Sequence, residues 1–494
     1  MIRIRVWPAL QALVCILTAA MPVDAAMLVS PGNSVLRHDL RFLDDRGIIR
    51  MPLSAWPISQ ADIERALKAV DDASLSVAEL AAMNRIRDRL HFERRGARVS
   101  YGLSLASNPR EIRAFADTPR DESNAVVGLE WSGERVAVSL QAGYAANPVD
   151  EDEYRLDDSW VGFLLGNWIF SAGWQQRWWG PGHDGSLIMS TNARPMPALS
   201  MQRNSSEAFD NRWFGWIGPW TASVFMAGLD DERGINDALL FGFRFTFRPT
   251  ENVEIGLSRS AQWCGIGRPC DGSTLLDLLA GKDNRGVNVG PEDEPGNQLA
   301  GIDMRWRLPT EQPLAVYMQW IAEDTRRGGP ELGSWLRLAG LEYRGNASSW
   351  QHVSHIEIAE TSCRRGGLGF SDNNPGCAYE HGIYRSGYRY RGRSIGHGVD
   401  GDGLTYSLGT TLLQSTDRSW DAKIRYSEIN RLGANSAMHS ISATGIEQFD
   451  LFIRHNRQIS SGEISLGLGW LKRIDSIDQG REDDLQAFLQ WQSN

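Results

Sequence analysis

The sequence predicts an all-β transmembrane barrel that carries a small helical bundle at its N-terminal end. Three observations predict this fold class. The chain opens with an apolar leader, apolar residues later alternate with polar ones over most of the length, and no later window offers the roughly 20 apolar residues that a membrane-spanning helix requires. Any segment that crosses a membrane must therefore be a strand of a closed barrel.

The composition fits a barrel and argues against several other classes. The 494 residues include 51 Lys and Arg against 61 Asp and Glu, and the resulting net charge of −10 disfavours a general nucleic-acid binder. The 42% of hydrophobic residues and the 50 glycines match neither a disordered chain nor a helical membrane protein. The 19 tryptophans are unusually many, and a barrel places such amphipathic rings in two interfacial girdles.

Residues 1–25 have the pattern of a secretory signal peptide. Arg3 and Arg5 precede an apolar run at 9–20, and small residues before Ala26 offer a cleavage site. Cys15 lies inside the apolar run and has no small-residue motif before it, which disfavours a lipoprotein. We expect an exported chain that begins near residue 26.

Export predicts an oxidising compartment for the four cysteines that follow the leader. They form two local pairs, Cys264 with Cys270 and Cys363 with Cys377, each in a stretch rich in Gly, Asp and Asn. Neither pair has histidines at zinc-binding spacing, so we expect disulfides in two long loops rather than a metal site.

Residues 26–96 have a helical pattern. Ser76 and Glu79 form a capping box, and the apolar residues after it recur at spacings of three and four. Ser59 starts a second helix, and Leu36, Leu40 and Leu43 indicate a third. Three helices this short need a larger partner to pack on.

Residues 97–494 change to a period of two, which predicts the barrel. At 239–247, Leu and Phe alternate with Gly, Arg and Thr, and similar segments recur up to Trp491. A soluble sandwich would alternate in the same way. Polar faces rich in Gly, Ser and Arg, and short turns that alternate with long loops, favour a barrel with a wet lumen. The length allows about 16 to 20 antiparallel strands.

The densest motif runs from Arg177 to Asp184 as RWWGPGHD and continues to residue 204. Pro195 and Pro197 each remove a backbone donor, so a strand ladder must be interrupted there. Irregular backbone at membrane depth is tolerated only inside protein or against water, and we therefore expect this segment in the lumen or along its rim. A cationic cluster beside Trp178 and Trp179 is expected from three residues, Arg177, Arg194 and Arg203.

This stretch, together with FGWIGPW at 214–220, resembles the signature of the capsule assembly Wzi family of outer-membrane proteins. The signal peptide, the helical start and the long remainder agree with that family in order and size. The resemblance implies about 18 strands, a periplasmic helical bundle, and a non-enzymatic role as a surface lectin that attaches capsular or extracellular polysaccharide to the cell.

A polysaccharide site would use arginine and aromatic side chains. Guanidinium groups grip the carboxylates of acidic polymers, and sugar rings stack on Trp and Tyr. The predicted polysaccharide-binding residues are Arg177, Trp178, Trp179, His183, Asp184, Asn192, Arg194, Arg203, Arg385, Tyr388, Arg389, Tyr390 and Arg391. Equally weighted alternatives pair Arg177, Arg194 and Arg203 with barrel carboxylates, and make 384–393 a strand end with its tyrosines in the girdle and its arginines in the lumen.

No metal or cofactor site is predicted. The acidic run at 150–153 lacks the glycine spacing of a calcium loop, and the spacing of His352 and His355 places them on opposite faces of a strand. The G-x-G-x-x-G match at 396–401 has no strand-to-helix context.

The expected partners are capsular or extracellular polysaccharide, outer-membrane lipid of a Gram-negative cell and the polysaccharide export machinery. A porin or polysaccharide-conducting channel is the alternative, which conductance in planar bilayers would reveal. An outer-membrane hydrolase ranks last because no nucleophile motif supports it.

Overall fold

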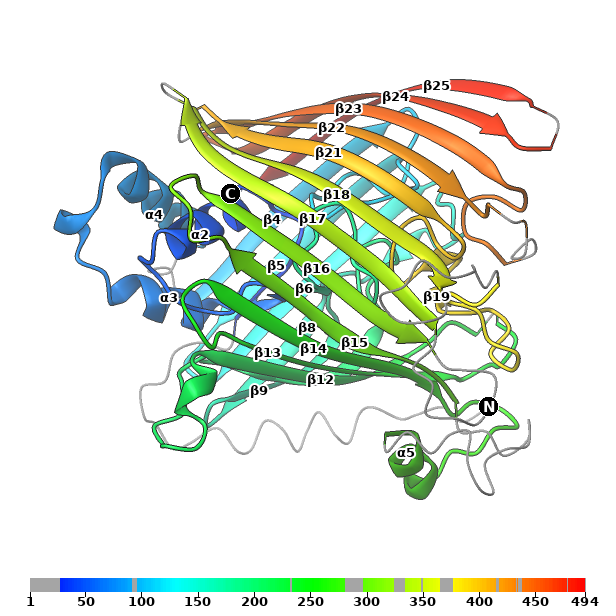
Figure 1. The fold of residues 1–494 in the computed structure, drawn as a ribbon, viewed down its shortest axis with the longest axis horizontal. Helices are drawn as coiled ribbons and strands as arrows, with labels where there is room; N and C mark the ends of the chain where they lie inside the picture. The colour runs from blue at the N-terminus through cyan, green and yellow to red at the C-terminus, as the bar shows by residue number, and fades with distance from the viewer. Residues whose placement is uncertain are drawn as a thin grey trace.

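The computed structural model of the protein describes residues 27–90, 96–231, 233–279, 296–323, 334–347, 350–364, 376–414, 417–431, 433, 438–477 and 479–493. The predicted signal peptide lies outside the described residues. Figure 1 shows a barrel with helices α2 (Ser34–Asp45), α3 (Gln60–Lys68) and α4 (Val77–Leu90) at one end, and α5 (Gly272–Leu279) at the other. These ends are called the helix end and the loop end below.

The three predicted N-terminal helices are present. The carboxylate of Glu79 accepts from the backbone N–H of Ser76 at 2.8 Å, and the side chain of Asn33 accepts from the N–H of Leu36 at 2.8 Å. Short 3-10 turns, η1 (Asp72–Ser74) and η2 (Gly215–Ile217), occur elsewhere. No helix among the described residues is long and apolar enough to cross a membrane.

Eighteen antiparallel strands close the barrel, which confirms the predicted fold class. Two short pieces, β7 and β8, both pair with β6 and together form one interrupted strand. The wall consists of β4 (Gly96–Ala106), β5 (Ser123–Ser132), β6 (Val136–Ala146), β7 (Tyr154–Arg155), β8 (Trp160–Leu165), β9 (Trp168–Trp174), β11 (Pro197–Arg203), β12 (Trp220–Gly228), β13 (Leu239–Phe247), β14 (Val253–Trp263), β15 (Gly296–Arg307), β16 (Leu314–Glu323), β17 (Ser334–Ala347), β18 (Trp350–Arg364), β21 (Leu404–Leu413), β22 (Arg418–Ile429), β23 (Ile446–Ile459), β24 (Gly462–Asp475) and β25 (Arg481–Ser493).

The last strand closes on the first. The register runs from Phe488 opposite Ala106 to Gln492 opposite Gly102. In the part of the chain that the structure describes, six short strands lie outside the wall: β1 (Leu28–Val29), β2 (Ala55–Trp56), β3 (Ile58–Ser59), β10 (Trp178–Trp179), β19 (Arg389–Tyr390) and β20 (Arg393–Ser394).

The apolar face of the wall points outward. On β4, Tyr101, Leu103 and Leu105 are exposed, whereas the alternating Ser104 is buried inside. Exposed Leu, Ile, Val and aromatic residues recur in the same way on most other strands. A soluble sandwich would bury this face, so the outward apolar belt identifies a lipid-facing barrel.

The inward face is polar and heavily charged. Arg244 donates to Asp303 at 2.7 and 2.9 Å, and both side chains are buried. Longer connections lie at the loop end, where the described residues 175–196 and 376–403 lie between wall strands. Short turns such as 133–135 lie at the helix end.

Candidate functional site

The lumen is filled from both ends by the chain itself. Helix α2 enters from the helix end, and residues 177–196 fold inward from the loop end. Strand β2, which follows α2 in the chain, meets strand β10 of this inward segment as a small antiparallel sheet in which Trp178 lies opposite Trp56 and Trp179 opposite Ala55. We call residues 177–196 the plug segment. Its inward path agrees with the interruption of the strand ladder expected from Pro195 and Pro197.

Both predicted tryptophans pack the interior of this plug. Trp178 and Trp56 each meet the ring of Phe115 edge-on, at centroid distances of 5.4 and 5.3 Å. Trp179 lies 5.5 Å from the ring of Phe225 on β12. Trp178 and Trp179 are 0% and 1% exposed, so neither ring is accessible from the surface in this structure.

Asp184 ties the plug segment to the wall. Its carboxylate accepts from Arg425 at 2.6 and 2.7 Å and also pairs with Lys423, both on β22. Burial alone would raise the pKa of Asp184, but the charges of Arg425 and Lys423 hold it well below its usual range. The carboxylate is therefore ionised and fully engaged inside the barrel.

The neighbouring turn is held by a second carboxylate. Glu357 on β18 accepts from the backbone N–H groups of His183, Asp184 and Gly185, at 2.7, 3.1 and 2.9 Å. The imidazole Nε2 of His183 lies 2.6 Å from Glu342 on β17. The pKa of His183 is lowered to about 4, mainly by burial and to a smaller extent by the positive charge of Arg37. This imidazole is neutral at ordinary pH.

Arg194 and Asn192 fix the far end of the plug segment. Arg194 pairs with Asp157, Asp150 and Asp152 at 2.9, 2.8 and 2.9 Å, which is the structural pairing considered as the alternative. Burial opposes its charge, yet these carboxylates raise its pKa. The Asn192 amide donates to the carbonyl of Ser394 at 3.2 Å.

The three predicted cationic residues do not gather in one place. Arg177 is buried over the ring of Phe225 and donates to Ser200 at 2.7 Å. Arg203 ends β11 at the helix end, where its guanidinium lies 3.5 Å from the ring centre of Trp220. The length of β11 separates it from Arg194, so the expected cluster beside Trp178 and Trp179 is not formed.

The second predicted segment forms a buried hairpin over the plug. The hydroxyl of Tyr388 donates to the carbonyl of Ile188 at 2.9 Å. Arg389 pairs with Asp400 at 2.6 Å and with Glu380. Burial raises the pKa of Tyr388 above its usual range, so this hydroxyl is a neutral donor.

Two of the thirteen predicted residues reach the loop-end surface. Arg385 is exposed, and no described residue accepts a hydrogen bond from its guanidinium. Arg391 is partly exposed, lies over the buried ring of Tyr390 at 5.7 Å and pairs with Asp152 at 2.8 Å. These two cations are the predicted groups that a large external polymer can contact directly.

The loop end also holds a hollow that sequence reasoning missed. Cavities of about 370 and 90 Å³ lie beside the ends of β23–β25 and share Arg473 and Glu482. Arg481 and Asp475 line the larger one. The only signal in the sequence is the run of charged residues before 476 and after 480, a pattern that ordinary solvated turns share.

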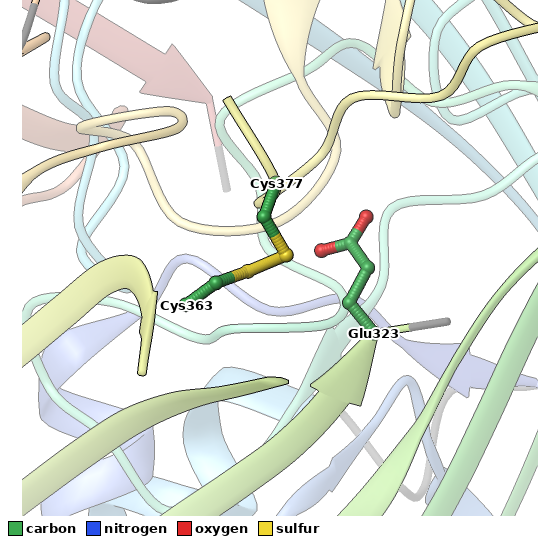
Figure 2. Close-up of side chains that lie close together, drawn as sticks. All are labelled: Glu323, Cys363 and Cys377. Carbon is green, nitrogen blue, oxygen red and sulfur yellow. A yellow bond between two sulfur atoms is a disulfide. The ribbon is translucent and has the colours of Figure 1, made fainter. Parts of the chain in front are cut away.

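Two disulfides hold the loop end, between Cys264 and Cys270 and between Cys363 and Cys377. Figure 2 shows Glu323 beside the second disulfide, and its carboxylate accepts from the N–H of Tyr379 at 3.0 Å. Among the described residues, Glu323, Cys363 and Cys377 form the one group of three metal-ligating side chains. Because metals bind thiolates, the disulfide disqualifies this group as a metal site.

The fold and the filled lumen define the class of the protein: an outer-membrane β-barrel whose interior is occupied by its own chain. The Capsule assembly protein Wzi family matches residues 104–477. The chain belongs to this family.

Two relatives agree with that assignment. An uncharacterized 55.8 kDa protein in the cps region of Klebsiella pneumoniae is 32% identical over 414 residues, covering 82% of this chain and 78% of that protein. The solved structure of Wzi from Escherichia coli has a TM-score of 0.81 at 26% identity, covering 94% of this chain and 99% of that one. That protein is described as an outer-membrane protein involved in group 1 capsule assembly and as a carbohydrate-binding β-barrel.

Proposed function

We propose that this barrel is a surface lectin that attaches capsular or extracellular polysaccharide to the outer face of the outer membrane. The observation that carries the proposal is the family match over 104–477. The carbohydrate binding described for the Escherichia coli relative supports it. The protein would act by holding the polymer, without a catalytic step.

The loop end is the proposed outer face. Outer-membrane barrels have short periplasmic turns and long external loops, which places helices α2 to α4 on the periplasmic side. Residues 26–96 would then form a periplasmic unit whose first helix enters the lumen, and residues 97–494 the barrel proper. The polysaccharide export machinery would contact the chain at the helix end.

Arg385 and Arg391 are the proposed polymer contacts at the loop end. The buried members of the predicted set, such as Asp184 and Arg389, would position the loops that present these two cations. This division rests on burial: a polymer can reach an exposed guanidinium directly but can reach a buried one only if the plug moves.

A porin is the less favoured function because α2 and the plug segment occupy the lumen. A cavity of about 450 Å³ remains beside them along β4–β6 and β23–β25. Arg120 lies at its edge and donates to the carbonyls of Thr191 and Asn192 at 2.7 and 2.9 Å. We expect an electrically quiet barrel in planar bilayers.

Polysaccharide retention in a deletion strain tests the proposed function. Cell-attached and released polymer are measured while total synthesis is tracked. The proposal predicts less attached and more released polymer at constant synthesis, restored by the intact gene. Unchanged pools in the deletion strain would refute it.

A further inference from the structure

Residues 204–219 connect β11 to β12 at the helix end, and we call this segment the rim loop. It presents three large aromatic side chains: Trp213 is 77% exposed, Phe214 53% and Trp216 64%. Residues 214–219 of the loop belong to the 214–220 stretch noted in the sequence. The proposed polysaccharide contacts lie at the loop end, so they give these residues at the helix end no role. A compact group of exposed aromatic rings marks an interaction surface.

Both ends of the rim loop are fixed to the rest of the protein. The N–H of Ser206 donates to Asp62 on α3 at 2.9 Å, and the N–H of Arg248 donates to the carbonyl of Pro219 at 2.9 Å. Gly218 has φ of +69°, and a Cβ there would lie 2.0 Å from the carbonyl oxygen of Arg248. Only glycine fits this close approach.

The middle of the loop is ordered by one side chain. The Asn211 carbonyl oxygen Oδ1 accepts from the N–H groups of Trp213 and Phe214 at 3.1 and 2.8 Å. The backbone carbonyl of Asn211 accepts from the N–H of Gly215 at 2.9 Å, and the 3-10 turn η2 that follows is closed by bonds from Ile217 to Phe214 and from Gly218 to Gly215 at 3.0 and 3.1 Å. The three rings are therefore held in position before any partner binds.

The rim loop continues the lipid-facing surface of the wall. Trp216 lies perpendicular to Phe247 at a centroid distance of 6.2 Å, and Phe209 stacks on Trp220 at 4.7 Å. Trp220 in turn lies 5.6 Å from Phe245. Phe245 and Phe247 alternate with buried residues on the outward face of β13, so these contacts join the loop to the apolar belt.

We propose that the rim loop inserts Trp213, Phe214 and Trp216 into the headgroup region of the adjoining lipid leaflet and thereby fixes the depth of the helix end in the membrane. Indole rings favour this region because they combine an apolar body with an N–H donor. Arg212, whose guanidinium lies 6.0 Å from the Trp213 ring, can pair with lipid phosphate. This inference does not depend on polysaccharide binding.

A single introduced cysteine tests the lipid contact. Gly215 is the chosen site because it lies between the aromatic residues and a Cβ there would be 3.5 Å from its nearest neighbour, the carbonyl oxygen of Phe209. The four cysteines of the described residues are paired, so in a chain expressed without Cys15 only the cysteine of the Gly215→Cys variant should react with a nitrobenzoxadiazole dye. Glu311→Cys, on the exposed turn at 308–313 of the same end, is the matched control.

The labelled barrels are reconstituted into vesicles of phosphatidylethanolamine and phosphatidylglycerol. We expect dye at 215 to emit at shorter wavelength than dye at 311 and to be quenched several-fold more by headgroup-proximal spin-labelled lipid. Emission and quenching equal to those at 311 would overturn the proposal.

A second variant shows whether the rings cause the contact. Adding Trp213→Ala, Phe214→Ala and Trp216→Ala to the Gly215→Cys chain should move emission and quenching toward the values at 311. Unchanged values in a folded triple variant would overturn the role of the rings. If the triple variant fails to fold, the comparison of 215 with 311 in chains with intact rings still decides whether the loop contacts lipid.

Discussion

At the scale of single residues, buried charge pairs hold the plug segment against the wall. Asp184 is the clearest case because it meets two cations of β22, Lys423 and Arg425, within a fully buried setting. Removing the carboxylate of such a group leaves buried positive charge without full compensation, in a medium that solvates it poorly. The cost of losing Asp184 should therefore exceed that of losing any surface carboxylate.

Asp184→Asn should lower the free energy of unfolding by about 3–5 kcal/mol, because it removes the carboxylate that pairs with Lys423 and leaves Arg425 only its longer contact with Asp450, at 3.4 Å. Urea unfolding of the purified barrel, followed by tryptophan emission, measures this loss. Asp210→Asn, at an exposed position of the rim loop, is the control and should change stability little. Equal effects of the two substitutions would contradict the anchoring role of Asp184.

Buried histidines predict how stability depends on pH. Burial lowers the pKa of His397 to about 4, and burial together with Arg37 does the same for His183. Unfolding returns each pKa to about 6.5, so between these values the unfolded chain binds more protons. The free energy of unfolding should therefore decrease as pH falls, by about 2 kcal/mol per histidine near pH 4.5.

The substitution His397→Gln should remove part of that decrease, since glutamine does not titrate. Urea unfolding midpoints between pH 7.5 and 4.5 provide the measurement. A His397→Gln variant with the same pH dependence as the parent would contradict this assignment. The carboxylate Asp400, with its pKa lowered to about 2 by Arg389 against the effect of burial, responds only at lower pH.

The residue types at the candidate site could be read from the sequence, but their partners could not. Arg194 finds three carboxylates 37 to 44 residues away, and Asp184 finds Arg425 at a separation of 241. An exposed arginine such as Arg385 and a buried one such as Arg389 look identical in a glycine-rich loop. The fold decides between them, because burial depends on which distant segment covers the loop.

At the scale of elements, period and capping predicted the strands and helices but not where α2 lies. The spacing of Leu36, Leu40 and Leu43 indicates a helix with one apolar face, which suits packing on a surface. The structure buries its polar face as well, including Arg37 and Arg41, because the lumen supplies charged partners such as Glu254. Amphipathicity identifies a helix without identifying its environment.

The end of α2 is pinned by acid–base pairs, which predicts a conductance effect. Asp44 pairs with Arg248, and Asp45 pairs with Arg305 and Arg344 at 2.7 and 2.9 Å. The double variant Asp44→Ala/Asp45→Ala should loosen the helix and give ion-conducting events in planar bilayers where the parent is quiet. Asp88→Ala on the exposed face of α4 is the control. A folded double variant that stays as quiet as the parent would contradict this role.

At the scale of the whole molecule, the barrel is closed by two insertions that meet in the lumen. The sequence predicted the lipid-facing wall, since alternation repeats along nearly every strand. It did not predict closure, because the pairing of Trp56 with Trp178 joins segments 122 residues apart and leaves no local pattern. Because the lumen is filled, a large polymer can contact this barrel at the surface of its long loops. Arg385 and Arg391 lie on that surface and are the proposed polysaccharide contacts.

Equilibrium binding of the purified barrel to capsular polysaccharide from its source strain tests the central claim most directly. The account predicts saturable binding that weakens several-fold in Arg385→Ala/Arg391→Ala, with unchanged unfolding, because two accessible cations are lost. Arg418→Ala, which removes an exposed cation at the helix end, should bind like the parent. Absence of saturable binding by the parent, or equal binding by the loop-end variant, would contradict the account.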